Sequence, residues 1–235
     1  MSGETISQDI EFQCPHCKGR NTVMLWPRIE AESAPELMDR LCAGTLFDHV
    51  CSHCYETTSL DHTVLVELGA ARTAILNLPP NDPLARVVSL EDPALSEFHL
   101  RRVTDSNALR ELAVILRDGL DDSTMLVLKH MLAARVMQDR GEPPVLLAYE
   151  STMRDGSRDW MEYMLFQTEE SEPEILTVPL SVYMDVERTA APLKDDVFPV
   201  GRWIDWNDDT ARRVWDRVQK DPASRHSGIF AEEEV

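Results

Sequence analysis

Basic residues are scarce in this chain of 235 residues, in which 23 Lys and Arg residues face 42 Asp and Glu residues, for a net charge of −19. A surface of this charge repels phosphate backbones and anionic lipids, so the composition disfavours general binding to nucleic acids or membranes. The sequence contains no uncharged apolar run close to the roughly 18 residues that a membrane-spanning helix needs. Its first twenty residues have no apolar stretch of an export signal. The sequence therefore predicts a soluble, cytoplasmic protein.

Catalytic signatures are missing from the sequence as well. It has no Gly-rich phosphate-binding loop, no Gly-x-Ser-x-Gly turn and no His-Glu-x-x-His helix, which are motifs typical of nucleotide-binding enzymes, hydrolases and zinc proteases. An active site in the C-terminal part would need scattered side chains to converge, and the candidates are His99, His130, Asp155 and Glu162. The sequence leans away from an enzyme and keeps one as its third hypothesis.

The acidic excess is concentrated in the last third of the chain. Residues 141–235 contain 21 acidic and 10 basic residues, a net charge of −11. Solvated loops and a frayed, disordered tail over residues 223–235 explain such a distribution. An acidic surface for a basic partner is the alternative.

Two Cys-x-x-Cys pairs, Cys14–Cys17 and Cys51–Cys54, are separated by 33 residues. Zinc prefers four ligands at the corners of a tetrahedron, and two such pairs supply four thiolates. An extended run precedes each pair, and turn-prone or polar residues follow it, which is the order of a zinc ribbon. Four thiolates leave no coordination position for water or substrate. The sequence therefore predicts a structural Zn²⁺ ion bound by Cys14, Cys17, Cys51 and Cys54.

A redox role for the first pair is the competing interpretation, because Cys-Pro-His-Cys also occurs in thioredoxin-fold oxidants, where a helix N-terminus activates the first Cys. Here the strand-like residues 22–26 follow, and no helix is placed to activate Cys14. Structural disulfides are rare in the cytoplasm. Cys42 is interpreted as a buried thiol outside the pairs. The nearby histidines are interpreted as surface residues or as neighbours of the site: His16, His49, His53 and His62.

Between and after the cysteine pairs, the pattern predicts a helix and then two strands. Ser33–Glu36 has the pattern of a capping box with Pro35 just inside the helix, and Gly44 provides a stop, so a helix is expected over residues 34–43. Strands are expected over 62–68 and 72–78.

Downstream, an extended run at 99–103 leads into a helical hairpin. Asp105 or Ser106 caps the first helix, which ends at Gly119. Asp121 or Asp122 caps the second, and we interpret these carboxylates as caps and not as catalytic groups. The core face of the second helix contains Met125, Leu128, Leu132 and Val136.

The C-terminal third is expected to form a small antiparallel sheet and a helix. Strands are predicted over 144–149, 158–166 and 174–180. A final helix over about 208–219 is capped by Asp208 or Asp209, and Trp203 and Trp206 before it are interpreted as packing anchors.

Together these patterns predict an α+β fold with an N-terminal zinc-ribbon-like module that contains an inserted helix, then a helical hairpin, then a small antiparallel sheet with a C-terminal helix. Four segments are expected. They are the zinc-ribbon-like module at 1–80, a linker and hairpin at 81–140, a C-terminal α+β region at 141–222 and the disordered tail at 223–235.

This combination resembles the CpXC family, which is named for its paired cysteine motifs. The matching segments are Cys14–Cys17, Ala34–Leu37, Gly44–Phe47, Cys51–Cys54 and the stretch from Arg101 to Asp122. The chain departs from the family pattern after each second Cys, where Lys18 and Tyr55 replace Gly, and at Ser52, which replaces Pro. The resemblance implies a bacterial, zinc-ribbon-like protein without an assigned activity.

Two further hypotheses rank above an enzyme. The first is a non-enzymatic interaction or adaptor protein, in which a structural zinc holds the ribbon and the C-terminal α+β region presents a surface to a protein partner. The second is a transcription- or translation-associated factor that also acts through a protein partner. Direct nucleic-acid binding is disfavoured because the basic residues near the cysteine pairs are few (Lys18, Arg20 and Arg28). No membrane partner is expected, and a homo-oligomer stays open.

Overall fold

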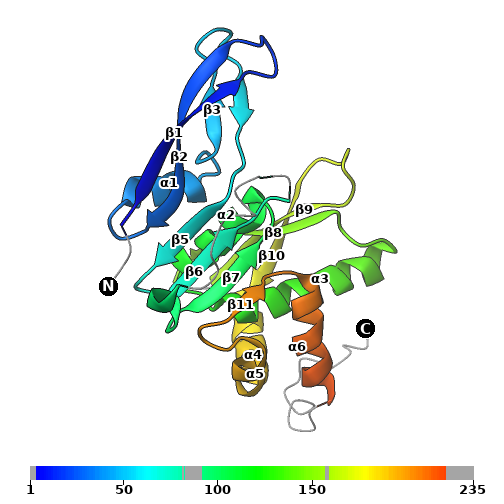
Figure 1. Cartoon of the computed structure of the whole chain (residues 1–235). Coiled ribbons are helices and arrows are strands. Elements are labelled where there is room, and N and C mark those ends of the chain that lie inside the picture. Colours follow the sequence, from blue (N-terminus) through cyan, green and yellow to red (C-terminus); the bar gives the residue numbers. More distant parts are fainter. Residues whose placement is uncertain (1–3, 81, 83–91, 157–158, 221–235) are drawn as a thin grey trace. The chain divides into compact units, whose positions relative to one another are not determined.

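The computed structural model describes residues 4–80, 82, 92–156 and 159–220 (Figure 1). It divides into two compact units, one formed by residues 1–113 and 200–205 and the other by 114–199 and 206–235. The predicted tail at 223–235 lies outside the described residues. The four predicted segments stay predictions.

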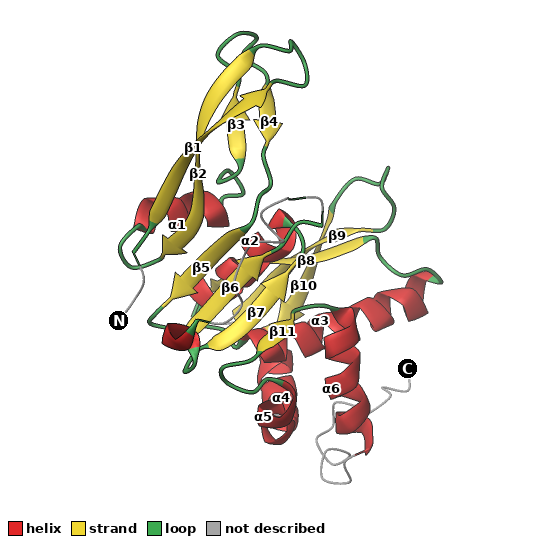
Figure 2. Ribbon diagram, in the orientation of Figure 1, coloured by secondary structure: helices red, strands yellow, loops and turns green. Residues whose placement is uncertain are grey.

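The first unit is built on a six-stranded mixed sheet in the order β1-β2-β5-β6-β7-β11 (Figure 2). Pairs β1–β2 and β5–β6 are antiparallel, whereas β2–β5, β6–β7 and β7–β11 are parallel. A separate two-stranded sheet pairs β3 with β4. The strands are β1 (Ile6–Gln13), β2 (Arg20–Glu30), β3 (Asp48–Val50), β4 (Thr57–Ser59), β5 (Val64–Leu68), β6 (Thr73–Asn77), β7 (His99–Val103) and β11 (Trp203–Asp205).

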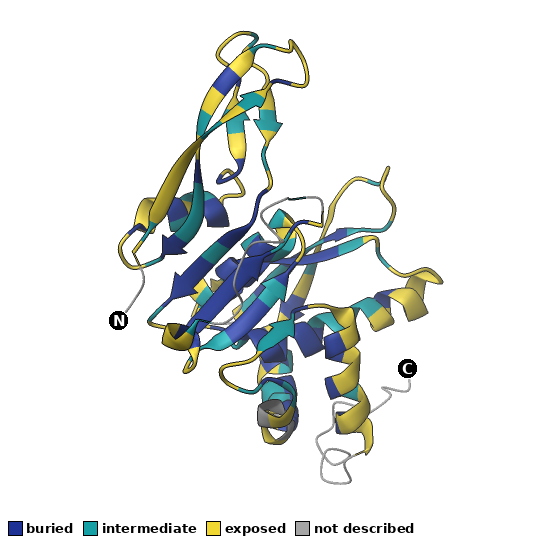
Figure 3. Cartoon of the chain, in the orientation of Figure 1, coloured by how far each residue is buried: buried dark blue, intermediate teal, exposed yellow. Residues whose placement is uncertain are grey.

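The centre of this sheet forms the core of the unit. All five residues of β6 are buried, as are four of the five in β5, and Figure 3 shows these two strands in dark blue. Such nearly continuous apolar runs are typical of strands that are covered on both faces. Within β2, Pro27 falls at a β-bulge where Ile6 pairs with Arg28 and Gln8 with Leu25. A bulge accommodates proline because the ladder is already interrupted there.

The helix between the cysteine pairs is present as α1 (Pro35–Cys42). Gly44 ends it in the left-handed conformation, with φ of 76°. The predicted capping box is wrong, because the N-cap residue is Ala34, which makes no side-chain cap. The hydroxyl of Ser33 instead donates to the carbonyl of Glu30 at 3.1 Å. Proline at the first helical position compensates, since it has no N–H that needs a cap.

Both downstream helices are present, as α2 (Ser106–Arg117) and α3 (Asp122–Arg140). Asp121 caps α3 by accepting a hydrogen bond from the backbone N–H of Thr124, as predicted. Most of α2 lies in the first unit and α3 lies in the second. The hairpin as one packed element therefore stays a prediction. A 3₁₀ turn, η2 (Pro93–Leu95), precedes β7.

The second unit contains the predicted antiparallel sheet, in the order β10-β9-β8. Its strands are β8 (Leu146–Arg154), β9 (Asp159–Phe166) and β10 (Glu174–Pro179). Tyr149 and Tyr163 are fully buried, with ring centroids 5.7 Å apart. Helix α3 packs against α4 (Leu180–Ala190), α6 (Asp208–Lys220) and β8. Two short helical turns, η3 (Ala191–Leu193) and α5 (Lys194–Val197), follow α4. The chain is therefore α+β.

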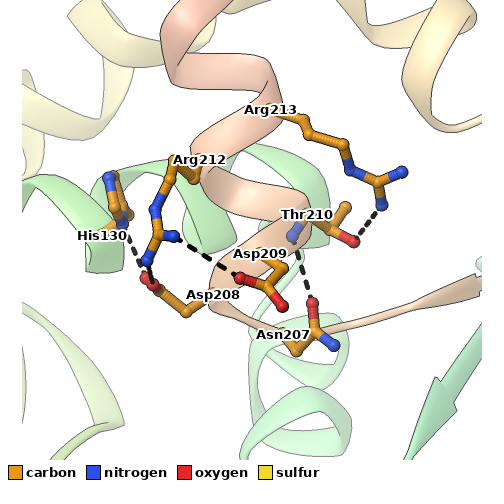
Figure 4. Close-up of polar contacts among 7 residues, drawn as sticks. All are labelled: His130, Asn207, Asp208, Asp209, Thr210, Arg212 and Arg213. Carbon is orange, nitrogen blue, oxygen red and sulfur yellow. Dashed lines mark hydrogen bonds and ion pairs between the residues drawn. The ribbon is translucent and has the colours of Figure 1, made fainter.

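The start of α6 corrects a prediction about its cap (Figure 4). The side chain of Asn207, and not that of Asp208 or Asp209, accepts a hydrogen bond from the backbone N–H of Thr210 at 3.1 Å. The two aspartates occupy the first turn, where negative charge favours the helix dipole. Trp206, just before the cap, is buried, as expected of a packing anchor.

Within the part of the chain that the structure describes, no helix is both long and apolar enough to cross a membrane.

Candidate metal centre

The first cysteine pair lies in the turn between β1 and β2. The backbone N–H of Lys18 donates to the carbonyl of Cys14 at 2.9 Å, and the N–H of Cys14 donates to the carbonyl of Gly19 at 2.9 Å. These two bonds close a tight loop, which we call the first knuckle (residues 14–19). Both thiols of the pair consequently leave the turn at one corner.

The second pair repeats this pattern between β3 and β4. Here the N–H of Tyr55 donates to the carbonyl of Cys51 at 2.9 Å, and the N–H of Cys51 donates to the carbonyl of Glu56 at 3.0 Å. We call residues 51–56 the second knuckle. The two knuckles have the same backbone hydrogen bonds although only their cysteines and histidines match in sequence.

The four sulfur atoms of the knuckles converge. The Sγ atoms of Cys14, Cys17, Cys51 and Cys54 all lie within 4.8 Å of one another. Those of Cys14 and Cys54 are 3.8 Å apart, and those of Cys17 and Cys51 are 3.7 Å apart. Four thiolates about 2.3 Å from a central zinc ion have sulfur–sulfur distances of about 3.8 Å. The four cysteines are positioned to hold a metal ion.

Backbone N–H groups point at the sulfur atoms. Gly19 donates to the Sγ atom of Cys17, and His53 donates to that of Cys51, each at 3.4 Å. Such bonds favour the thiolate, the form that binds metal. Burial raises the pKa of Cys51. The N–H groups of His53 and Cys54 and the Asn21 amide lower it by more, so that the pKa of this thiol is about 5.

Cys54 shows the opposite effect. The backbone N–H of Glu56 lowers the pKa of its thiol, whereas burial and the thiols of Cys17, Cys51 and Cys14 together raise it to about 12. Four clustered thiols cannot all ionise at neutral pH without a cation among them. The cluster is therefore suited to a divalent metal.

Asn21 links the two knuckles and was not predicted as a site residue. Its side chain is 6% exposed, and its Nδ2 atom donates to the Sγ atom of Cys51 at 3.4 Å and to the carbonyl of Gly19 at 3.1 Å. Its Oδ1 atom accepts from both the backbone N–H and the hydroxyl of Ser52, each at 2.9 Å. The buried amide of Asn21 thus connects the backbone of the first knuckle to Cys51 and Ser52 of the second knuckle.

Ser52, which departs from the family pattern, therefore has a physical role. A proline at this position would provide neither the N–H nor the hydroxyl that Asn21 accepts. We expect Ser52→Pro to lower the free energy of unfolding of the two knuckles by about 1–3 kcal/mol, the cost of an unsatisfied buried acceptor. Metal affinity, measured by competition with a chromophoric chelator, should fall about tenfold.

Ser52→Ala is the matched control, because it keeps the N–H and should have a smaller effect. Pro15 occupies the equivalent position of the first knuckle, so proline is compatible with this turn. Unchanged metal affinity in Ser52→Pro would mean that Asn21 does not couple the knuckles.

The other two departures, Lys18 and Tyr55, adopt the backbone conformation that glycine favours. Their φ angles are 62° and 64°. The left-handed region costs an L-residue about 1–2 kcal/mol, a cost that glycine avoids. The knuckle geometry is thus formed without glycine, at some cost in stability.

Tyr55 is 79% exposed, so its side chain adds little packing. We expect Tyr55→Gly to leave the melting temperature of the metal-loaded protein unchanged or to raise it, since relief of strain offsets the greater freedom of the unfolded chain. Tyr55→Val should lower the melting temperature, because a β-branched residue tolerates positive φ poorly. A higher melting temperature for Tyr55→Val than for Tyr55→Gly would show that strain at this position does not matter.

Three of the histidines near the knuckles have rings that contact groups other than the four sulfur atoms. The Nε2 atom of His53 lies 2.9 Å from the carbonyl of Arg20, and the Nδ1 atom of His62 lies 2.9 Å from the carbonyl of Leu60. The His49 ring packs edge-on against Phe12. His16 is exposed, and Cys42 is buried at the end of α1, outside the sulfur cluster.

The scattered candidates for an active site form no common cluster in the second unit. His130 lies 2.6 Å from Asp208, a contact drawn in Figure 4. Burial raises the pKa of Asp208, but His130 and Arg212 lower it more. Glu162 bonds Ser151 and Trp160. Asp155 lies at the β8–β9 turn, and His99 lies in β7 of the first unit. Among the residues described, the four cysteines are the one group of three or more His, Cys, Asp or Glu side chains close enough to share a metal.

The comparisons with known proteins agree with this geometry. A family model described as CpXC protein matches residues 12–129, half of the chain, and this stretch contains both knuckles. No curated protein and no solved structure matches the chain.

Proposed function

The chain belongs to the CpXC family, and from this membership and the geometry of its four cysteines we propose that it is a non-enzymatic adaptor built on a zinc-ribbon-like module. In this proposal one structural Zn²⁺ ion, bound by Cys14, Cys17, Cys51 and Cys54, fixes the two knuckles. A surface of the protein then binds a protein partner.

Zinc is favoured over other metals by the chemistry of the donors. Four thiolates at tetrahedral distances suit zinc, which is not redox-active under cellular conditions and which thiolates bind tightly. The Asn21 amide and the N–H groups that point at the sulfurs neutralise part of the thiolate charge, as outer ligands of metal sites do.

The observation that carries the proposal is the closed character of the sulfur cluster. The four Sγ atoms lie within 4.8 Å of one another, so a bound ion has four protein ligands and no open position for water or substrate. Metals in such sites contribute folding energy and not chemistry. A small module stabilised in this way is suited to presenting a surface.

The test is affinity capture of the tagged, full-length protein from its native host, with and without nuclease, followed by mass spectrometry. A stoichiometric partner that survives nuclease, and that the Cys51→Ser variant loses while Cys42→Ser retains it, supports an adaptor that depends on the metal module. A partner lost on nuclease treatment favours a factor associated with nucleic acid. Capture of no partner contradicts the adaptor.

A further inference from the structure

The four cysteines of the metal centre differ in their exposure to solvent. Cys14 is 0% exposed and Cys51 is 1% exposed, whereas Cys54 is half-buried and Cys17 is exposed. An oxidant that arrives from solution therefore meets Cys17 first. Cysteines that sense oxidants combine thiolate character with access to solvent. A zinc ligand is held as the thiolate, so Cys17 of the zinc-loaded protein has both properties.

The hydrogen bonds to the sulfur atoms differ in the same sense. The Sγ atom of Cys51 accepts from the backbone N–H of His53 and from the side chain of Asn21, each at 3.4 Å. Among the described residues, a single N–H group, that of Gly19, donates to the Sγ atom of Cys17. Hydrogen bonds that stabilise a thiolate also make it a weaker nucleophile. Cys17 is therefore both more accessible and less restrained than Cys51.

The charges around Cys17 favour its oxidation as well. Residues 12–27 contain Lys18 and Arg20 and no Asp or Glu, although the net charge of the chain is −19. Both of these cations are exposed, and the second knuckle in contrast ends at Glu56. Oxidation of a thiolate by peroxide expels hydroxide, and nearby cations stabilise this anion as it forms. Reactive cysteines commonly lie in such electropositive, accessible surroundings.

We propose that Cys17 is a modification site through which hydrogen peroxide oxidises the metal centre. The thiolate of Cys17 attacks one peroxide oxygen, the O–O bond breaks and hydroxide leaves, so that Cys17 becomes a sulfenic acid. A second thiolate of the cluster, in which all four sulfur atoms lie within 4.8 Å of one another, then attacks the sulfenic sulfur. A disulfide forms and a second hydroxide leaves, so two thiolates have passed two electrons to one peroxide molecule.

The disulfide removes two of the four ligands of the centre. The knuckles then lose the free energy of metal binding on which their folding depends. Thiol reductants restore the thiolates and with them the site. The inference rests on the zinc module of the proposed function and adds a regulation to it, because a partner that depends on this module is released under oxidising conditions.

The experiment treats the full-length, zinc-loaded protein with hydrogen peroxide in the presence of dimedone, which traps sulfenic acids. Mass spectrometry of peptides at early times identifies the trapped cysteine, and a chromophoric chelator measures the zinc released. Cys17→His removes the reactive thiolate and keeps a ligand of the kind found in Cys₃His sites. Cys54→His is its matched control, because Cys54 is the next most exposed of the four ligands.

We expect dimedone first on Cys17 and recovery of the site after reduction. Zinc release should slow about tenfold in Cys17→His and stay within about twofold in Cys54→His, since access decides which thiolate reacts. First trapping at another cysteine, or zinc release from Cys17→His at the rate of the unaltered protein, overturns the proposal. If a His variant does not bind zinc, trapping in the unaltered protein decides. A preparation without zinc before peroxide is added contradicts the metal module, whereas a loaded centre with an unreactive Cys17 overturns this inference alone.

Discussion

Cys51→Ser is expected to abolish stoichiometric zinc binding and to unfold the two knuckles. Cys51 is 1% exposed and accepts hydrogen bonds from the backbone of His53 and the side chain of Asn21. A serine hydroxyl is a poor zinc ligand at neutral pH, and the shorter side chain moves the donor away from the metal. Structural zinc sites bind with about 10–16 kcal/mol, and this free energy is coupled to folding. Loss of the metal therefore removes most of the stability of the knuckles.

Two measurements check this expectation. The zinc content of the desalted protein, measured by mass spectrometry of metals, should fall from about one zinc per chain to near zero, as expected for a site that loses one of four ligands. Hydrogen exchange should accelerate in β3, β4 and the adjoining ends of β1 and β2.

Cys42→Ser is the matched control, since Cys42 is also buried but lies in α1, outside the cluster. It should keep its zinc. If Cys51→Ser retained one zinc per chain with unchanged exchange, the metal would not be structural.

Gly19→Ala is expected to weaken zinc binding by about 10- to 100-fold, the range seen when groups around metal ligands are altered. A Cβ atom at Gly19 would lie 2.5 Å from Cδ2 and 2.8 Å from Cγ of His53, and 3.2 Å from the Sγ atom of Cys17. The His53 ring cannot move away freely, because its Nε2 atom bonds the carbonyl of Arg20 and its backbone lies between Cys51 and Cys54. The clash must therefore displace a knuckle.

A double-mutant cycle tests this explanation. His53→Ala alone loses one hydrogen bond, worth about 1 kcal/mol. In the Gly19→Ala background it also removes the ring that the new methyl group strikes, so part of the zinc affinity should return. Zinc affinities of the four proteins give the coupling energy, which should be favourable by about 1–3 kcal/mol. Additive effects of the two substitutions would show that the ring is not the obstacle.

Local signals in the sequence predicted most of the elements. The predicted run at 99–103 matches β7, Gly44 ends α1 in the left-handed conformation, and Asp121 caps α3. These features depend on residues close in sequence. The metal site is also encoded locally, because two Cys-x-x-Cys turns specify most of its chemistry by themselves.

Features that depend on distant parts of the chain were missed. The parallel pairing of β7 with β6 and with β11 joins segments about 25 and 100 residues apart. Strand β11 has only three residues, which are too few to show the alternation of apolar and polar residues that marks a strand. Helix α4 follows β10 directly and has no capping side chain, so the sequence offered no start signal at Leu180.

The same limit explains the residues missed around the site. Asn21 lies just after a knuckle, where a polar residue is ordinary, and its importance comes from Ser52, 31 residues later. At α6, three consecutive residues can each serve as a cap, and the backbone selects Asn207. In both cases the deciding factor is the direction of a side chain, which composition and spacing do not contain.

The central claim is that four thiolates and no other group bind a zinc ion. Zinc-edge X-ray absorption of the full-length, zinc-loaded protein tests it most directly. We expect four sulfur atoms at about 2.3 Å and no nitrogen or oxygen in the first coordination sphere. A sphere with fewer than four sulfurs, completed by histidine nitrogen or water, would contradict the claim and would reopen the site to catalysis.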